Sequence, residues 1–266
     1  MIGQNNIKQK LISLYEQNKL PKVIIINGPK GSGKKELVKW FSQNSNIPFK
    51  LFENKIDDVR SAIETSLNEY TPNLYVFNNI EQLGASQNKA SQNALLKFLE
   101  EPPVNIYVFL LCKDKSLLLP TILNRGIVLD LENYTKEELQ NFNDNELALS
   151  VFNTPGDLIK SKEIDVEKLV TDTNKIIDLL DKARISNALT LSKYIKIKDE
   201  DEGYDLDLFI KSLKYCFVQK YKENKSERLR QMFNTFYNAL NHVKINPKYF
   251  MDNFVINNYR EIQSWI

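Results

Sequence analysis

A short apolar run followed directly by a glycine-rich loop constrains the fold of this chain more than any other feature. Residues 23–26 read Val-Ile-Ile-Ile, a β-branched run that predicts a fully buried strand. The loop at 28–35 reads Gly-Pro-Lys-Gly-Ser-Gly-Lys-Lys, and a helix over about 36–43 follows it. A buried strand, a glycine loop and a helix in this order indicate a phosphate-binding P-loop.

Apolar runs and amphipathic segments alternate through the rest of the first half. Further strands are expected at 74–77, 106–111 and 127–131. Helices are expected at 1–20, 56–69 and 86–100, with a short helical turn at 120–124. Strands that alternate with helices predict an α/β fold, in which a mostly parallel sheet is covered on both faces.

The pattern changes after Leu131, because the remaining segments have helical periodicity only. Helices are expected at 135–142, 144–152, from Pro155 onward, and at 165–183, 205–222, 226–243 and 247–263. An acidic stretch at 199–203 reads as a solvated loop. We therefore divide the chain into an α/β domain (1–132), a small helical segment (133–163) and an all-α domain (164–266).

The composition excludes several classes of function. The 266 residues are 42% hydrophobic and 26% charged with a net charge of +2, which is typical of a globular protein and not of a general nucleic-acid coat. The chain has one histidine and two cysteines in no CxxC pair, so we expect neither a metal site nor Ser-His-Asp chemistry. No apolar run is long enough to span a membrane and the first residues are polar, so we expect a cytoplasmic protein.

The glycine loop matches the P-loop pattern G-x-x-x-x-G-K-[ST] except at its last position. Gly28, Gly33 and Lys34 fit the pattern, and Gly31 lies between the two glycines. The glycines let backbone N–H groups turn toward a phosphate, and Lys34 would reach the outer phosphates. Lys35 stands where a hydroxyl should bind Mg²⁺, and an ammonium group has no lone pair for a cation.

The strand at 74–77 ends without the acids that ATP hydrolysis needs. Asn78 and Asn79 stand where one carboxylate should hold Mg²⁺ and a second should activate water. The loop is then either a retained structural turn, a site of residual ATP, ADP or phosphate binding without turnover, or a true hydrolytic site. We expect no resident cofactor and a degenerate Mg²⁺ site, with residual binding as the alternative.

Two motifs carry a resemblance to a known family. Residues 94–103 resemble the "ALLKxLEEPP" segment of bacterial clamp-loader subunits, and residues 118–125 resemble their "LLPTIxSR" segment. The resemblance covers about residues 1–131, including Gly3-Gln4, and is loose in the second half. The chain is most similar to the delta-prime type of DNA polymerase III subunit. This implies an AAA+ fold, with 133–163 as its lid and 164–266 as a collar domain.

The resemblance also implies roles for single residues. Arg125 occupies the position of an arginine finger, which reaches into the ATP site of a neighbouring subunit. The alternative is an arginine in a surface ion pair. Cys112 falls on the sensor-1 position, where a thiol is a weak hydrogen-bond donor. Asn124 and Gly126 depart from the family pattern around the arginine.

The helix expected at 86–100 begins with residues that could face DNA. Gln87, Asn88 and Lys89 lie at this helix start, where N–H groups and an ammonium suit a phosphate backbone. The alternative is an ordinary solvated helix start. The partners implied by the resemblance are ATPase and delta-like clamp-loader subunits, the sliding clamp, and primer–template DNA reached through the complex.

The expected function is that of a non-hydrolysing delta-prime-like stator in a clamp loader, with Arg125 completing a neighbour's ATP site. A second hypothesis is an active motor subunit with unusual metal ligands, for which Asp57, Asp58 and Glu81 are candidates. A third is a stand-alone module that binds DNA or protein, whose affinity for DNA would fall steeply with salt.

Overall fold

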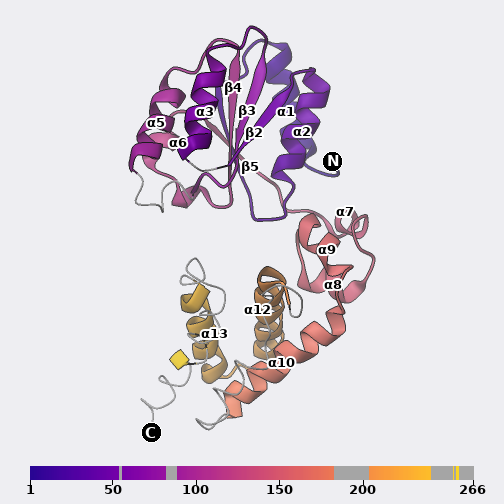
Figure 1. The fold of residues 1–266 in the computed structure, drawn as a ribbon. Coiled ribbons are helices and arrows are strands. Elements are labelled where there is room, and N and C mark those ends of the chain that lie inside the picture. The colour runs from indigo at the N-terminus through magenta and orange to yellow at the C-terminus, as the bar shows by residue number, and fades with distance from the viewer. Residues whose placement is uncertain (54–55, 82–88, 183–203, 241–253, 255, 258–266) are drawn as a thin grey trace. The chain divides into compact units, whose positions relative to one another are not determined.

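The computed structural model describes residues 1–266 except 54–55, 82–88, 183–203, 241–253, 255 and 258–266 (Figure 1). The chain forms two compact units, each described here by itself. The first comprises Met1–Glu138 with Thr154–Gly156, and the second comprises Leu139–Asn153 with Asp157–Ile266.

A five-stranded sheet forms the centre of the first unit, with the order β2-β3-β4-β1-β5. The strands are β1 (Val23–Asn27), β2 (Phe49–Phe52), β3 (Asn73–Phe77), β4 (Ile106–Cys112) and β5 (Ile127–Asp130). All neighbouring strands pair in parallel. Ile24 of β1 lies opposite Phe109 of β4 on one side and Ile127 of β5 on the other, so β1 is an inner strand.

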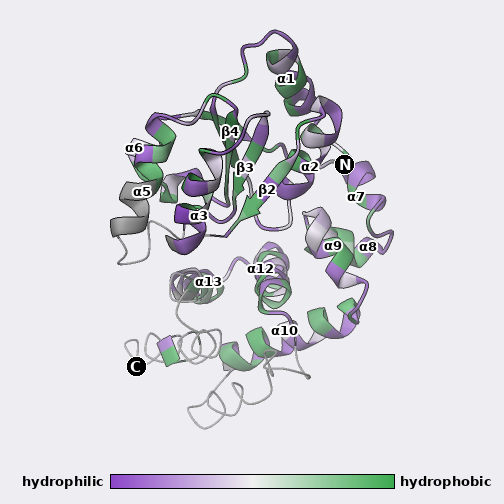
Figure 2. Cartoon of the chain, turned by 45° about the horizontal axis from the view of Figure 1, so that its top comes forward, coloured by the Kyte–Doolittle hydropathy of each residue, from purple (hydrophilic) through white to green (hydrophobic). Residues whose placement is uncertain are grey.

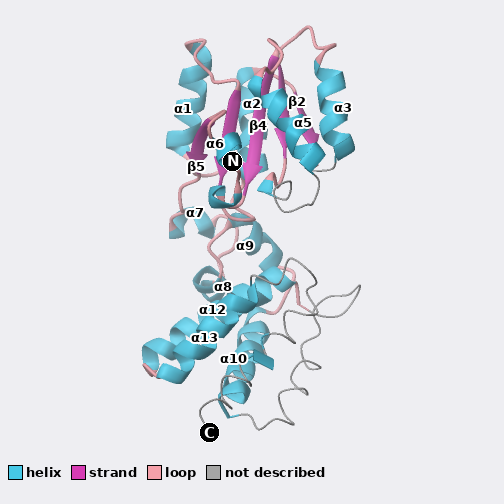
Figure 3. Ribbon diagram, turned by 90° about the vertical axis from the view of Figure 1, so that its left-hand side faces the viewer, coloured by secondary structure: helices cyan, strands magenta, loops and turns pink. Residues whose placement is uncertain are grey.

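Helices cover both faces of this sheet (Figure 3). They are α1 (Asn5–Glu16), α2 (Lys34–Ser45), α3 (Ile56–Ser66), α5 (Lys89–Glu100) and α6 (Pro120–Leu123). The strands bury residues on both faces: Ile24 and Ile26 join a core with α1 and α2, whereas Ile25 joins a core with α3 and α5. Burial on both faces explains why these strands read as continuous apolar runs.

The sequence predicted four of the five strands, and the α/β fold with a parallel sheet is confirmed. The edge strand β2 was missed because its residues are largely exposed. Phe49 and Leu51 are 41% and 44% exposed and Lys50 stands between them, so the segment lacks a buried apolar run. The first predicted helix is shorter than expected and ends at Glu16.

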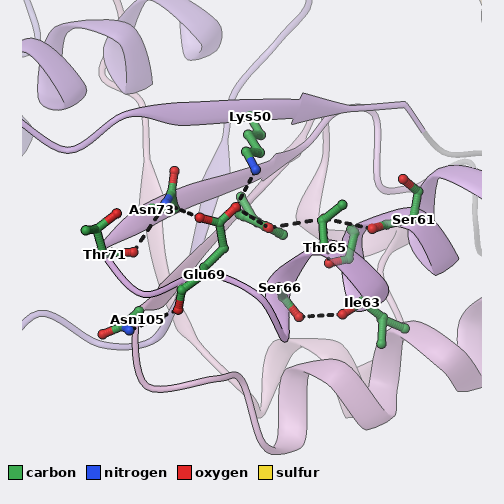
Figure 4. Close-up of polar contacts among 11 residues, drawn as sticks. Lys50, Ser61, Ile63, Thr65, Ser66, Glu69, Thr71, Asn73 and Asn105 are labelled. Carbon is green, nitrogen blue, oxygen red and sulfur yellow. Dashed lines mark hydrogen bonds and ion pairs between the residues drawn. The ribbon is translucent and has the colours of Figure 1, made fainter.

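Polar side chains connect the loops at the amino ends of β2, β3 and β4 (Figure 4). The Glu69 carboxylate accepts hydrogen bonds from Lys50 and, at 2.8 Å, from Asn73 Nδ2. Asn105 Nδ2 donates to the carbonyl oxygen of Glu69 at 3.1 Å. The loop before β3 is thereby joined both to the edge strand and to the loop before β4.

The second unit contains helices that bury apolar stripes (Figure 2). Those that lie in it wholly or mostly are α8 (Glu146–Val151), α9 (Pro155–Ser161), α10 (Val166–Lys182), α12 (Leu206–Glu223) and α13 (Glu227–Leu240), and α7 (Lys136–Gln140) precedes them. Asp205 caps α12 by accepting from the N–H groups of Asp207 and Leu208. Phe217, Phe236 and Phe254 form an aromatic cluster with ring centroids 5.7–6.3 Å apart.

The predicted helices of the second half correspond to helices of the structure wherever residues are described. The predicted acidic loop at 199–203 and most of the predicted helix at 247–263 lie outside the described residues. Among the described residues, no helix combines the length and apolar character that crossing a membrane requires.

Candidate functional site

The glycine-rich loop follows β1 and leads directly into α2. Gly31 and Gly33 have φ values of 81° and 84°, in the left-handed region that glycine adopts without strain. Gly33 is the N-cap residue of α2, and a Cβ atom there would lie 3.2 Å from the Tyr134 hydroxyl oxygen. The left-handed glycines therefore shape the turn before a helix N-terminus, which is where a P-loop binds phosphate.

Lys34 is held against this loop from the first turn of α2. Its Nζ atom donates hydrogen bonds to the carbonyl oxygens of Gly28 and, at 2.8 Å, Pro29. Burial lowers the pKa of Lys34, and the nearby negative charge of Glu81 acts in the opposite direction. An ammonium group has three N–H donors, so these two bonds leave one donor for a ligand.

Lys35, which stands where the P-loop pattern has a Mg²⁺-binding hydroxyl, lies beside the carboxylate of Glu53. Lys35 Nζ lies 3.7 Å from Glu53 Oε1, and Asn78 Nδ2 lies 3.4 Å from Glu53 Oε2. Glu53 follows β2, so sequence analysis missed this carboxylate together with its strand. Asn79, the other position that lacks an acid, has a left-handed φ of 49°. An ammonium and an amide thus lie around one half-exposed carboxylate.

Glu81 is the buried acid of this region. The residue is 7% exposed, and its Oε2 has no hydrogen-bond partner among the described residues. It lies near enough to Lys34 and Cys112 to raise the pKa of both groups. The sequence identified Glu81 only as one of three substitute metal ligands. Asp57, by contrast, is exposed on α3, where it lies 3.9 Å from Arg60.

Cys112 ends β4 beside the glycine loop, at the position that the resemblance assigns to sensor 1. Its Sγ atom lies 3.5 Å from Asn27 Oδ1 and 3.7 Å from the carbonyl oxygen of Ile26. Burial, followed by the charge of Glu81, raises the pKa of the thiol to about 12. Cys112 is therefore a neutral thiol that contacts β1, and it carries no charge with which to influence a phosphate.

Residues from distant parts of the first unit hold the loop in place. The Tyr134 hydroxyl donates to the carbonyl oxygen of Ser32 at 2.9 Å, and the Gly156 N–H donates to that of Gly31 at 2.9 Å. Gln4 forms two bonds with the backbone of Glu132, donating at 2.7 Å and accepting at 2.9 Å. Gln4, part of the Gly-Gln pair in the resemblance, thus fixes the chain after β5.

Arg125 lies at the opposite end of the sheet from the glycine loop. It follows α6 and precedes β5, and its side chain is 36% exposed. Its guanidinium pairs with the carboxylate of Glu100 at the end of α5. The structure therefore brings together the two motifs of the resemblance, 94–103 and 118–125. In the single chain Arg125 occupies the surface ion pair considered as an alternative.

The residues expected to face DNA are not placed by the structure. Gln87 and Asn88 lie outside the described residues, and Lys89 begins α5 with a side chain that is likewise not described. Their contact with DNA stays a prediction from sequence.

The loop residues fit the phosphates of a nucleotide, because the backbone turn is present and Lys34 keeps one donor. Among the described residues, no group of three or more His, Cys, Asp or Glu side chains could form a metal cage. A cation here would therefore take most of its ligands from phosphate and water, as Mg²⁺ commonly does.

Comparison with solved structures places this fold in a known class. A DNA polymerase III gamma subunit-related protein from Thermotoga maritima matches with a TM-score of 0.55 at 21% identity, covering 93% of this chain and 98% of that chain. The RuvB Holliday junction branch migration motor of the same organism matches with a TM-score of 0.50 at 20% identity, covering 83% and 78%. Identities this low show the fold alone, and the fold is that of the AAA+ class.

A family model matches part of the first unit. The family described as "DNA polymerase III, delta subunit" matches residues 50–135. This range lies within the first unit and includes both motifs that carry the resemblance to clamp-loader subunits. The comparison with curated proteins gives no match.

Proposed function

We propose that this chain is a delta-prime-like clamp-loader subunit that does not hydrolyse ATP itself. It would act as a stator in a cytoplasmic hetero-oligomer with ATPase and delta-like subunits. Arg125 would complete the ATP site of a neighbouring subunit while the sliding clamp is loaded at primer–template DNA. The observation that carries this proposal is the exposure of Arg125, the last residue of the second family motif. The same chain lacks three metal-site groups, one in its glycine loop and two after β3.

The chemistry of its own site supports the absence of turnover. Hydrolysis in ATPases of this type needs a carboxylate that holds Mg²⁺ and a base for the attacking water. The amides at Asn78 and Asn79 are poor Mg²⁺ ligands and cannot accept a proton. Lys35 supplies a positive charge where a hydroxyl ligand is needed. These three substitutions act on the same step, so restoring any single one would leave the others missing.

The environment of Arg125 supports a role outside its own chain. A guanidinium is charged at all physiological pH values and can bind phosphate oxygens with two parallel hydrogen bonds. Its partner Glu100 is 50% exposed, so the ion pair is solvated and costs little to break. Arg125 can therefore exchange a carboxylate for the phosphates of a neighbouring nucleotide.

We further propose that residues 133–163 form the lid of the AAA+ domain and residues 164–266 the collar that joins the ring. The helical character of the second unit and its buried aromatic cluster suit such a role. The DNA contact at Gln87, Asn88 and Lys89 belongs to the same proposal.

The test is the ATPase rate of the complex that assembles on this chain, purified through a tag on it. Arginine fingers contribute about 10³- to 10⁵-fold to phosphoryl transfer, so Arg125→Ala should nearly abolish turnover at the one site that it completes. Arg60→Ala is the matched control, because Arg60 is an exposed arginine on α3. Unchanged turnover in an intact Arg125→Ala complex would refute the finger role.

The isolated chain separates the stator from the active motor. It should release no phosphate from ATP and Mg²⁺ above the background of a Lys34→Met variant. Turnover that depends on Lys34 would instead identify a motor subunit.

A further inference from the structure

Glu81 is a buried acid in the nucleotide-binding region that no part of the proposed function uses. Its Oε2 atom has no hydrogen-bond partner among the described residues, although the residue is only 7% exposed. Burying a carboxylate oxygen without a hydrogen-bond partner is unfavourable, because the oxygen loses its hydration and gains nothing in return. Such an oxygen indicates a ligand that the described residues do not supply.

The surroundings of Glu81 define the chemistry of that ligand. The N–H group of Ile80 donates to the carbonyl oxygen of Leu111 at 3.0 Å, which ties the backbone next to Glu81 to β4. The negative charge of Glu81 raises the pKa of both Lys34 and Cys112. Lys34 follows the glycine loop, and Cys112 ends β4. Glu81 is thus close to the lysine that in a P-loop reaches the outer phosphates of a nucleotide.

Lys34 does not itself satisfy this carboxylate. Its ammonium donates to the carbonyl oxygens of Gly28 and Pro29, and no hydrogen bond joins it to Glu81 among the described residues. The same two bonds orient Lys34 toward the glycine loop, which leaves its remaining donor for a phosphate. A phosphate on Lys34 and a carboxylate beside it would repel each other unless a cation lay between them.

We propose that Glu81 is the acid of this nucleotide site and faces the divalent cation carried by a bound nucleoside triphosphate. It takes the cation-holding role that Asn78 and Asn79 cannot fill, because Mg²⁺ needs only one or two carboxylates beside phosphate oxygens and water. The chain then binds a metal–nucleotide without turning it over. This inference goes beyond the proposed function and does not depend on Arg125.

Calorimetric titration of the isolated chain with ATP tests the inference, once with Mg²⁺ and once with EDTA. Wild-type protein should bind ATP more tightly with Mg²⁺. In Glu81→Gln this gain should fall by about ten- to a hundredfold, the range for groups that support a metal site. Its affinity in EDTA should be equal or higher, because a negative charge near the phosphates has been removed.

Two further carboxylates near the loop make the test specific. Glu36→Gln removes a charge from the exposed first turn of α2 and should leave the Mg²⁺ gain unchanged. Glu53→Gln removes the half-exposed carboxylate beside Lys35 and Asn78. A gain lost in Glu53→Gln and kept in Glu81→Gln would assign the cation to Glu53 and overturn the proposal.

Other outcomes are equally decisive. Wild-type protein that binds no ATP with Mg²⁺ at millimolar concentration would overturn the inference, as would an undiminished Mg²⁺ gain in Glu81→Gln. If Glu81→Gln does not fold, the electron paramagnetic resonance of Mn²⁺ with ATP on folded Glu81→Asp gives the same answer through a changed spectrum. Arg125→Ala should bind ATP and Mg²⁺ normally, so failure of the finger role and failure of this site are distinguishable.

Discussion

The two ends of the parallel sheet are organised in opposite ways. At the carboxyl ends of the strands, the glycine loop is held by Lys34, Tyr134 and Gly156 through several hydrogen bonds. At the amino ends, the Arg125 side chain is held by an ion pair with Glu100, and both groups are substantially exposed. The first end has a loop whose backbone is fixed by hydrogen bonds, and Lys35, Asn78 and Asn79 stand where the P-loop pattern has metal-site groups. The second end has a charged side chain in a solvated position.

This difference indicates where each end can act. A phosphate site depends on backbone N–H groups, so a turn that retains its geometry can still bind when side chains have changed. A guanidinium that acts on a neighbouring molecule must instead be able to leave its partner in the free chain. The predictions below test the rigidity of one end and the freedom of the other.

The largest effect is expected where the backbone beneath Arg125 is closely packed. A Cβ atom at Gly126 would lie 2.6 Å from the carbonyl oxygen of Val23 and 2.8 Å from its Cγ1. Gly126→Ala should therefore lower the free energy of unfolding by about 3 kcal/mol, as measured by urea denaturation. The neighbouring exposed Asn124→Ala should change it far less. If both variants lost the same free energy of unfolding, the backbone at Gly126 would not be closely packed against Val23.

The second prediction concerns the chain that follows β5 at the other end. Gln4→Ala removes both bonds to the backbone of Glu132 and should destabilise the protein by about 2 kcal/mol. Gln9→Ala, an exposed position on α1, is the matched control. A Gln4 variant as stable as the control would show that water replaces these bonds at no cost.

Lys34→Met should change the free energy of unfolding by less, and by an amount that depends on pH. Burial lowers the pKa of Lys34 in the folded chain below the value of 10.5, so the unfolded chain binds more protons between the two values. The stability of the wild type relative to Lys34→Met should thus rise with pH up to about 10.5. Below the lowered pKa, the cost of burying the charged ammonium should be fully present. Thermal unfolding from pH 8 to 11 measures this, with Lys35→Met as the exposed control. A difference independent of pH would contradict burial of the ammonium.

The smallest effect is expected from the ion pair at the amino end. Glu100→Gln should cost about 0.2–1 kcal/mol, and the loss should shrink in high salt because both partners are exposed. Glu101→Gln changes the adjacent acid and should have no larger effect. A loss well above this range in chemical denaturation would mean that Arg125 is fixed in its own chain, which would weaken the finger proposal.

Sequence reasoning worked best where burial leaves a strong pattern. The strands β1, β3 and β4 were predicted because their apolar residues are almost entirely buried, and β2 was missed because its residues are largely exposed. The edge strand β5 was predicted from its apolar run, although only Leu129 of it is buried. The same miss concealed Glu53, which follows β2. Asn27, which accepts from the Lys115 N–H and donates to Asp130, was missed because its partners are 88 and 103 residues away.

The candidate site could be predicted in its residues but not in its contacts. The sequence identified Lys34, Asn78 and Arg125 by their positions in motifs. It could not show that Glu100 pairs with Arg125, or that Glu81 is buried beside Lys34 while Asp57 is exposed. Spacing along the chain places a residue at one end of the sheet, whereas burial and partners depend on how distant elements pack.

The position of β1 inside the sheet sets a condition on how the chain matures during translation. Both neighbours of β1 come late: β4 ends at Cys112 and β5 ends at Asp130. Synthesis must therefore reach Cys112 before one side of β1 can pair fully, and Asp130 before the other side can. Until then the Val-Ile-Ile-Ile run is an unpaired apolar segment of the kind that attracts chaperones and aggregates.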